Sequence, residues 1–567
     1  MKSKTSFFNG MVFRKNITRF APVWAVYTLC LLLFVFANTG MSTVLFTLEM
    51  VRMMGPMAWI NLLYAGACAF YLFGDLFNSR LCNALHAFPL RREGWLLTGI
   101  VNGLLFSFVP NLLISLLACV LMKGYGYIAF IWLAISFLQF LFFFGTAVLS
   151  AMCAGNRLAM IAVYGILHFF FVLVYVILQQ LYQPLLYGIQ FNMNDFEYLI
   201  PVTQMEWAEY VSYAYQYNNE QFTFEGFVPA DWHYLGICAG VGIVGFVLAW
   251  LVYRRRHLET AGDFISLRPL APVFLTIYTL GVGMVLYMFA DLFDAKSYAF
   301  LAVGLIVGFF TGKMLLERAL RVFTKKAFLG FALLIAVLGG SMLVTWLDPI
   351  GIVNRVPDLD EIQWVSIYNS YGMAEYSLGD YSQITEPRFA YTDETEITQV
   401  QSLHRQLVDA KYNEDSPTSC AVRIMYLLKN GKRVQRFYYV DVETPLGRGV
   451  GAYYSDMRYV FQVNDVDTLY QQIRAAEVID ANKYGESSYM IKDEAELVGL
   501  LDAIRADCEA GTMAQVWAFQ RDATIRYSIV PKFDVIDSDN NAQQYRDLQI
   551  RDTCTNTVAY LKSLSAE

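Results

Sequence analysis

The first 346 residues contain nine apolar segments that are each long enough to cross a lipid bilayer. A helix needs about 20 apolar residues to span the hydrocarbon core. The expected spans are roughly 21–40, 55–76, 95–121, 126–152, 157–181, 233–253, 271–291, 297–316 and 327–346. The second span is the least apolar, because Gly55, Pro56 and the small residues of "YAGACAF" interrupt it. No cleavable signal peptide is evident before the first span.

The charge balance changes at about residue 347. Residues 1–346 carry 21 Lys or Arg and 15 Asp or Glu, whereas residues 347–567 carry 21 and 34. The first part is therefore apolar and mildly basic, and the second has the composition of an acidic soluble domain. An acidic domain argues against nucleic acid as a partner.

The basic residues of the apolar part alternate along the chain in a way that fixes its direction. With the N-terminus in the cytoplasm, the inner segments hold 18 Lys or Arg, and the outer connections hold three, which are Arg52, Lys123 and Lys296. Cytoplasmic loops carry this excess in membrane proteins. An odd number of spans then places the acidic domain outside the cell.

These observations predict a polytopic α-helical membrane protein with about nine transmembrane helices, followed by an α+β extracytoplasmic domain. Residues 1–20 are expected to form a cytoplasmic interfacial helix, and 347–567 the outer domain. Between spans five and six, an outer loop at 182–232 has no Lys or Arg, seven acidic residues and many aromatics. Its middle is interpreted as interfacial helices, either as a cap over a pathway or as a structural cap.

Within the outer domain, "AVRIMYLLKNGKRVQRFYYVDV" predicts a β-hairpin that turns at Asn430-Gly431. Amphipathic helices are expected near 395–411, 465–477 and 492–509. The domain holds three cysteines, so one disulfide at most can form within it, and Cys508 with Cys554 is one open pairing.

Small and polar residues inside the spans indicate how the helices pack. Gly304, Gly308 and Gly312 repeat every four residues, as do Gly236 and Gly240. This spacing lets helices approach closely, either within one subunit or in a dimer.

Two further polar positions lie within spans. His168 is interpreted as a neutral histidine bonded to a neighbouring helix, with a functional group as the alternative. Pro110 and Asn111 mark either a kink beside a polar pathway or simple packing.

No catalytic set is visible in the sequence. "GFFTGKM" has the Gly-Lys pair of a phosphate-binding loop, but the spacing is wrong and Met replaces the Ser or Thr that would bind Mg²⁺. There is no His-Glu-x-x-His and no Cys-x-x-Cys. The sequence thus predicts neither an ATPase nor another enzyme, and no metal site. An intramembrane enzyme would need a paired acid, base, metal or nucleophile that is missing.

Four stretches of the apolar part are informative: "SFFNGMVFRKNITRFAPVWAVYTLCLLL", "SRLCNALHAFPLRREGWLLTGIVNGLL", "YRRRHLETAGDFISLRPLAPVF" and "LLERALRVFTKKAF". They resemble segments of ABC-2 type permeases of Gram-positive bacteria, an export type. In the outer domain, "ITQVQSLHRQLV" and "KNGKRVQRFYYV" resemble a C-terminal domain of unknown function attached to such permeases. The resemblance implies a six-helix permease core at 21–253, so 254–346 would add three helices to the usual fold.

The resemblance also implies a site at the first inner loop, where permeases receive a separate ABC ATPase. A short helix from Leu81 to Phe88 is expected to end at Pro89 and to act as a lever for the ATPase. The expected coupling residues are Arg80, Asn83, Leu85, His86, Phe88, Pro89, Arg91, Arg92 and Glu93. The alternative is a topology anchor, in which the two arginines bind only anionic lipid.

The expected function is therefore the permease subunit of an ATP-driven exporter in the bacterial cell membrane. The implied partners are an ABC ATPase, a second permease subunit that is identical or homologous, and membrane lipid. The chain itself would hold no cofactor, because ATP and Mg²⁺ would bind to the ATPase. The alternative is an ABC-linked sensor whose outer domain binds an extracellular ligand.

Overall fold

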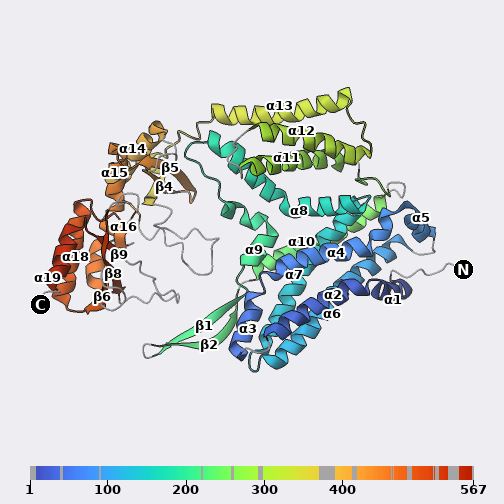
Figure 1. Ribbon diagram of the computed structural model, residues 1–567, viewed down its shortest axis with the longest axis horizontal. Coiled ribbons are helices and arrows are strands. Elements are labelled where there is room, and N and C mark those ends of the chain that lie inside the picture. Colours follow the sequence, from blue (N-terminus) through green and yellow to red (C-terminus); the bar gives the residue numbers. More distant parts are fainter. Residues whose placement is uncertain are drawn as a thin grey trace. The chain divides into compact units, whose positions relative to one another are not determined.

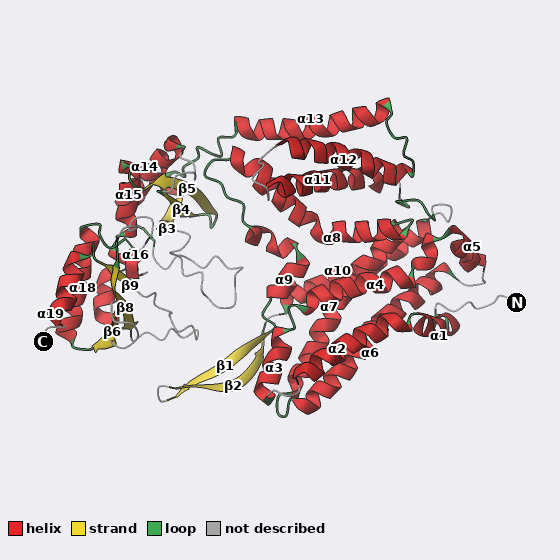
Figure 2. Ribbon diagram, viewed as in Figure 1, coloured by secondary structure: helices red, strands yellow, loops and turns green. Residues whose placement is uncertain are grey.

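The computed structural model describes most of the chain and divides it into two units (Figures 1 and 2). The helical unit comprises Met1–Leu178 and Asn192–Gly340, and the sheet unit comprises Gln179–Phe191 and Ser341–Glu567. The described residues are 8–38, 42–87, 91–218, 221–230, 232–256, 261–267, 269–291, 298–368, 390–411, 418–461, 463, 465–481, 488–514, 516, 523–533 and 548–564. The chain thus enters the sheet unit twice, first after α8 and again near the end of α13.

The helical unit begins with a short polar helix and continues with long apolar ones. Its helices are α1 (Gly10–Arg19), α2 (Ala21–Asn38), α3 (Thr43–Arg52), α4 (Met57–Leu72), η1 (Gly74–Phe77), α5 (Ser79–Ala87), α6 (Arg92–Leu121), α7 (Gly126–Cys153), α8 (Arg157–Ile177), η4 (Met193–Leu199), α9 (Pro201–Trp207), α10 (His233–Arg255), α11 (Leu270–Asp291), α12 (Tyr298–Glu317) and α13 (Lys325–Leu347). Seven helices in the described part are long and apolar enough to cross a membrane, or up to nine if two bent pairs each count as one span. The architecture therefore agrees with a polytopic helical protein, and its apolar helices suggest a membrane protein.

The two bent pairs explain why the first spans are less regular than the others. Helices α1 and α2 meet at 58°, and α3 and α4 meet at 57°. At the second bend, a Cβ on Gly55 would lie 2.1 Å from the backbone oxygen of Glu206. Only glycine allows this close approach between two backbones. The small residues that weaken the second span are thus used for packing.

Helix α7 lies in the core of the helical unit and packs closely against α10. A Cβ on Gly145 would lie 2.0 Å from the oxygen of Gly242, and one on Gly242 would lie 2.5 Å from the oxygen of Leu141. By contrast, a Cβ built on Gly236 or Gly240 would have no atom of another described segment within 4 Å. The close contact between α10 and α7 is therefore made by Gly242 and Gly145, and not by the predicted pair, Gly236 and Gly240.

Helices α11, α12 and α13 lie side by side (Figure 1). Along α12, Cβ atoms on Gly304, Gly308 and Gly312 would meet α11 at 2.8, 3.0 and 2.9 Å. The nearest atoms belong to Gly283, Thr279 and Leu275. This stripe of small residues therefore packs within the subunit.

The outer loop predicted at 182–232 contains a β-hairpin that was not predicted from the sequence. Strands β1 (Val211–Asn218) and β2 (Gln221–Pro229) pair antiparallel after the short helices η4 and α9. The alternation in "YAYQY" and "FTF" is the period-two signal of a strand. Helices are found only in the part that precedes the hairpin, as η4 and α9.

The sheet unit contains two antiparallel sheets with helices. Its elements are η2 (Leu178–Tyr182), η3 (Gln183–Leu185), η6 (Leu359–Glu361), β3 (Ile362–Tyr368), α14 (Glu394–Ala410), β4 (Ser419–Leu428), β5 (Arg433–Asp441), α15 (Pro445–Tyr454), α16 (Met457–Phe461), α17 (Val466–Gln472), β6 (Ile473–Asp480), β7 (Ser488–Ile491), α18 (Glu494–Glu509), β8 (Ile525–Phe533), β9 (Leu548–Arg551) and α19 (Thr555–Leu564). The strand orders are β3-β4-β5 and β7-β6-β8-β9.

The predicted hairpin at Asn430-Gly431 and two of the three predicted helices are confirmed. The turn is one residue longer than the two-residue turn that Asn-Gly favours: Leu428 N donates to Lys432 O at 2.9 Å, and Gly431, with φ +79°, donates to Leu428 O at 2.8 Å. The third helix, expected at 465–477, ends at Gln472, because the chain enters the buried strand β6. Cys508 and Cys554 are both free thiols, so the open pairing is not formed.

The two halves of the sheet unit have the same topology. The first runs β3, a bridge at Tyr391, α14, β4, β5, α15, and the second runs β6, β7, α18, β8, β9, α19. Tyr391 pairs with β3 as β7 pairs with β6. Asp393 and Asp493 each cap the following helix by accepting hydrogen bonds from the backbone nitrogens two and three residues later. We name residues 362–454 the first repeat and 473–564 the second repeat.

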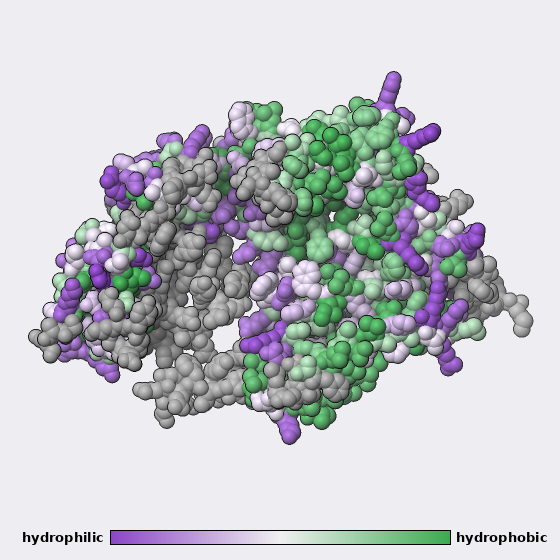
Figure 3. Space-filling model, viewed as in Figure 1, coloured by the Kyte–Doolittle hydropathy of each residue, from purple (hydrophilic) through white to green (hydrophobic). Residues whose placement is uncertain are grey.

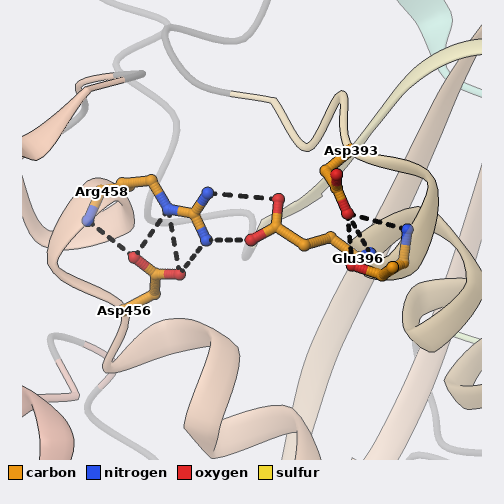
Figure 4. A network of polar contacts seen from close by, with 5 residues as sticks. Asp393, Glu396, Asp456 and Arg458 are labelled. Atoms are coloured by element: carbon orange, nitrogen blue, oxygen red, sulfur yellow. Dashed lines mark hydrogen bonds and ion pairs between the residues drawn. The ribbon is translucent and has the colours of Figure 1, made fainter.

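A charged network lies between the first repeat and α16 (Figure 4). The Nη2 atom of Arg458 lies 2.8 Å from both Glu396 Oε1 and Asp456 Oδ2. The guanidinium also stacks on the Tyr391 ring, 4.9 Å from its centre. These two carboxylates raise the pKa of Arg458, so it stays charged. Since other residues of α16 belong to the core of the second repeat, the network ties the repeats together.

Candidate functional site

A short helix is present where Leu81 to Phe88 was predicted to form one: α5 spans Ser79–Ala87, and Phe88 and Pro89 lie outside the described residues. The side chain of Asn78 caps it by accepting hydrogen bonds from the backbone nitrogens of Arg80 and Leu81, at 3.0 and 3.4 Å. Cys82 is buried, whereas the Leu81 side chain is 47% exposed. The helix therefore has one side anchored in the unit and another available to a partner.

The other predicted coupling residues that the structure describes belong to α5 or to the start of α6. Arg80 and Asn83 are exposed on α5. Arg91 is the residue before α6, and Arg92 and Glu93 lie in its first turn. Leu85 and His86 lie in α5, but the structure does not describe their side chains. Phe88 and Pro89 lie outside the described residues. The described members of the predicted set thus lie on α5 and at the start of α6.

The start of α6 is tied to the end of α10 through Arg256, which sequence reasoning did not single out. Arg256 is 5% exposed, and its guanidinium donates hydrogen bonds to three backbone oxygens. The acceptors are Ala151 at 3.1 Å, Met152 at 3.2 Å and Leu76 at 3.3 Å. Since Leu76 belongs to η1, directly before α5, this one side chain joins η1, α7 and α10.

The loop after α10 folds back onto the turn between α7 and α8. Gly262 donates its backbone N–H to the oxygen of Gly155 at 2.7 Å, and Ser266 Oγ donates to the oxygen of Cys153 at 2.7 Å. Ala154 and Ile265 form a β-bridge. This loop contains the "AGD" stretch, so that stretch serves to fasten two helix connections to each other.

Helix α1 is fastened to the same end of the unit. The backbone nitrogen of Asn9 donates to Thr98 Oγ1 on α6 at 3.2 Å. Arg19 and Asp75 form a two-bond ion pair at 2.8 and 3.0 Å. Hydrophilic side chains gather along the edge of the helical unit where α1 and α5 lie (Figure 3). We name this set of connected segments the inner clasp: α1, η1, α5, the first turn of α6, 153–157, 254–256 and 261–267.

A buried hydrogen-bond network links four apolar helices of the same unit. On α4, Asn61 Nδ2 donates to Gln139 Oε1 on α7 at 3.0 Å. On α6, Asn111 Nδ2 donates to the Tyr27 hydroxyl on α2 at 3.1 Å. Ser136 Oγ on α7 donates to Asn111 Oδ1 at 3.3 Å. All five side chains are at most 5% exposed. The two helices that α5 connects in sequence, α4 and α6, are thus hydrogen-bonded to α7 and α2.

Asn111 had been identified from its place beside Pro110, whereas Asn61, Ser136 and Gln139 had not. The available signal was a carboxamide or hydroxyl inside an otherwise apolar span. His168 lies 3.0 Å from Thr146 Oγ1 on the neighbouring helix α7, which confirms the interpretation of a histidine bonded between helices. Its Nδ1 has no hydrogen-bond partner in the described part of the chain.

Comparisons with protein-family models, with curated proteins and with solved structures find no match to this chain.

Proposed function

We propose that the chain is the membrane-spanning subunit of an ATP-driven exporter. The inner clasp carries this proposal, because it provides a short capped helix whose exposed side a separate ATPase can contact. The chain has no phosphate-binding loop of its own, so ATP and Mg²⁺ would bind to that ATPase. The resemblance of the inner segments to ABC-2 permeases supports the same reading.

The route from α5 to the apolar helices supports coupling. Helix α5 is joined in sequence to α4 on one side and to α6 on the other. Arg256 holds η1 against α7 and α10, and Arg92 Nη1 donates to the Arg256 backbone oxygen at 3.5 Å. A displacement of α5 would therefore act on several helices together. The buried network of Asn61 and Asn111 would carry the displacement to α2 and α7.

The charge distribution supports a cytoplasmic N-terminus and an extracytoplasmic sheet unit, and the resemblance to ABC-2 permeases supports a bacterial cell membrane. In the exporter, two permease subunits would flank one pathway, and two ATPases would bind inside. A second candidate is an ABC-linked sensor. The attachment of residues 179–191 to the sheet unit favours it, because this attachment joins a possible ligand-binding unit to the end of α8.

Replacing Arg80, Arg91 and Arg92 together by glutamine is expected to weaken ATPase binding. A protein interface that loses three cationic contacts at about 0.5–1 kcal/mol each should bind about ten- to a hundredfold less tightly. The measurement is co-purification of an ABC ATPase from membranes, at two salt concentrations. The matched control is Arg52→Gln with Lys123→Gln, which removes basic residues from the outer connections. Equal ATPase recovery from both variants would mean that the arginines do not bind the ATPase and act only as lipid anchors.

A further inference from the structure

Residues 179–191 form a short segment, here named the strap, that follows α8 and packs on the first repeat. The backbone nitrogen of Phe437 on β5 donates to the Gly188 oxygen at 3.0 Å. The Tyr187 hydroxyl donates to the Leu407 oxygen on α14 at 3.3 Å. The strap therefore occupies the free edge of the first sheet, and it continues directly into α8.

Gly188 lets the strap approach one particular side chain. It has φ +78°, and a Cβ there would lie 2.5 Å from the ring of Tyr438. The Tyr187 and Tyr438 rings are in contact, with centres 5.4 Å apart. The strap therefore packs directly against the ring of Tyr438.

Tyr438 belongs to a buried polar cluster around His404. The Nε2 atom of His404 lies 2.8 Å from the Tyr438 hydroxyl, and Nδ1 lies 3.0 Å from the Tyr426 hydroxyl. His404 has no exposed surface. A neutral imidazole has one donor and one acceptor, so one tyrosine accepts from it and the other donates to it. A protonated ring has two donors, so the tyrosine that now donates would lose its acceptor.

The second repeat shows that the fold does not require this cluster. His404 corresponds to Ile504, one hundred residues later in the equivalent helix α18. Strand pairing gives the other equivalents. In the first repeat, Val365 pairs with Tyr391 on one side and with Tyr426 on the other. In the second repeat, Ala476 pairs in the same way with Ile491 and Pro531. In the same register, Tyr438 corresponds to Ile550 and Arg436 to Leu548. Every one of these positions is buried in both repeats. The residues next to the strap are therefore polar or aromatic in the first repeat, whereas the equivalent core of the second repeat is aliphatic.

The surroundings of His404 oppose a second positive charge. Burial lowers the pKa of His404 to about 4, and the charges of Arg436 and Arg405 act in the same direction. The other titratable groups around the cluster are Tyr187, Arg355, Tyr426, Tyr438 and Tyr453. None of these groups from the described residues is a carboxylate. Opening of the cluster would return the histidine to an ordinary pKa near 6.5.

We propose that His404 makes the seating of the strap sensitive to acidity, so that acidification of the sheet unit releases the strap from β5 and frees the end of α8. The sign follows from proton linkage. The open form binds a proton below about pH 6.5 and the closed form only below about pH 4, so acid favours opening within this window. From pH 7.5 to pH 5.0 the ratio of closed to open strap should fall about thirtyfold.

The test is hydrogen–deuterium exchange of the full-length protein in lipid nanodiscs at pH 7.5 and pH 5.0. Rates are corrected for the intrinsic effect of pH on amide exchange. The reporters are peptides that cover 183–191 and 433–438, and peptides of β8 and β9 serve as an internal reference from the repeat that has Ile504 in place of His404. Protection at the strap is expected to fall about thirtyfold, while protection of the second repeat stays constant. Unchanged strap protection, or an equal loss in both repeats, would overturn the proposal.

His404→Gln is the matched variant, because its amide keeps a donor and an acceptor but does not titrate in this range. Its strap should show the same protection at both pH values. Loss of protection with acid in this variant, as large as in the wild type, would assign the effect to another group. Gly188→Ala should open the strap at both pH values. This readout needs no transported substrate and no ATPase, so it can fail or succeed independently of the exporter proposal.

Discussion

Gly242→Leu is expected to abolish the folded helical unit. Its side chain would enter the space where the backbones of α10 and α7 touch, with the first added atom 2.5 Å from Leu141 O. Neither backbone can yield as a flexible side chain would, so the helices must separate. We expect a cost at or above about 3 kcal/mol, the upper end of overpacking in protein cores.

The chain offers a matched control on the same helix. Gly240→Leu adds an identical side chain at a position where the described part of the chain places no atom of another segment within 4 Å of the new Cβ. The measurement is the temperature at which half of the detergent-purified protein remains monodisperse in size-exclusion chromatography. The control should melt close to the wild type, whereas Gly242→Leu should give little or no monodisperse protein. Equal behaviour of the two variants would contradict the close packing of α10 on α7.

Asp507→Ala is expected to cause the second large loss, in the second repeat. The carboxylate is fully buried and caps α19 from the end of α18. It accepts hydrogen bonds from the backbone nitrogens of Asn556 and Thr557 at 3.1 and 2.8 Å, and from the Thr557 hydroxyl at 2.6 Å. Alanine would remove the acceptor from all three donors, and the two donors of Thr557 are buried. We expect a loss of about 3–4 kcal/mol, because several donors are orphaned together.

Hydrogen exchange of the full-length protein can localise this loss. Protection should fall by more than a hundredfold across α18 and α19, since 1.4 kcal/mol corresponds to tenfold. Asp393→Ala is the control, because Asp393 also caps a helix but is exposed and should cost about 1 kcal/mol. A similar small effect for both variants would mean that α19 does not depend on Asp507.

Features that depend on local pattern were predictable from the sequence. The apolar spans follow from length and composition, and helices α14 and α18 follow from an apolar period of 3.6 with an aspartate at the start. The β4–β5 hairpin follows from Asn430-Gly431 between two apolar strands. Each of these signals lies within one segment, so no knowledge of the rest of the chain was needed.

Features that depend on distant partners were not predictable. Arg256 stands in a run of three arginines, and nothing local distinguishes the buried one from its neighbours. From the sequence, the strap is predicted as part of a loop, because the residues that it contacts, Leu407 and Phe437, lie more than 200 positions later in the chain. The repeat was hidden as well, because its two cores share shape but not chemistry, as His404 and Ile504 illustrate. Only the strand register reveals which residues correspond.

The central claim is that α5 receives an ABC ATPase, and photo-cross-linking from this helix tests it most directly. A photoreactive amino acid replaces Leu81, whose side chain is exposed on α5. The control site is Leu45, which is exposed on α3. Intact cells are irradiated, and the adducts are identified by mass spectrometry. The account predicts an adduct with an ABC ATPase subunit from position 81 and none from position 45. Adducts with lipid alone from position 81, at normal expression of the cell's ABC ATPases, would contradict it.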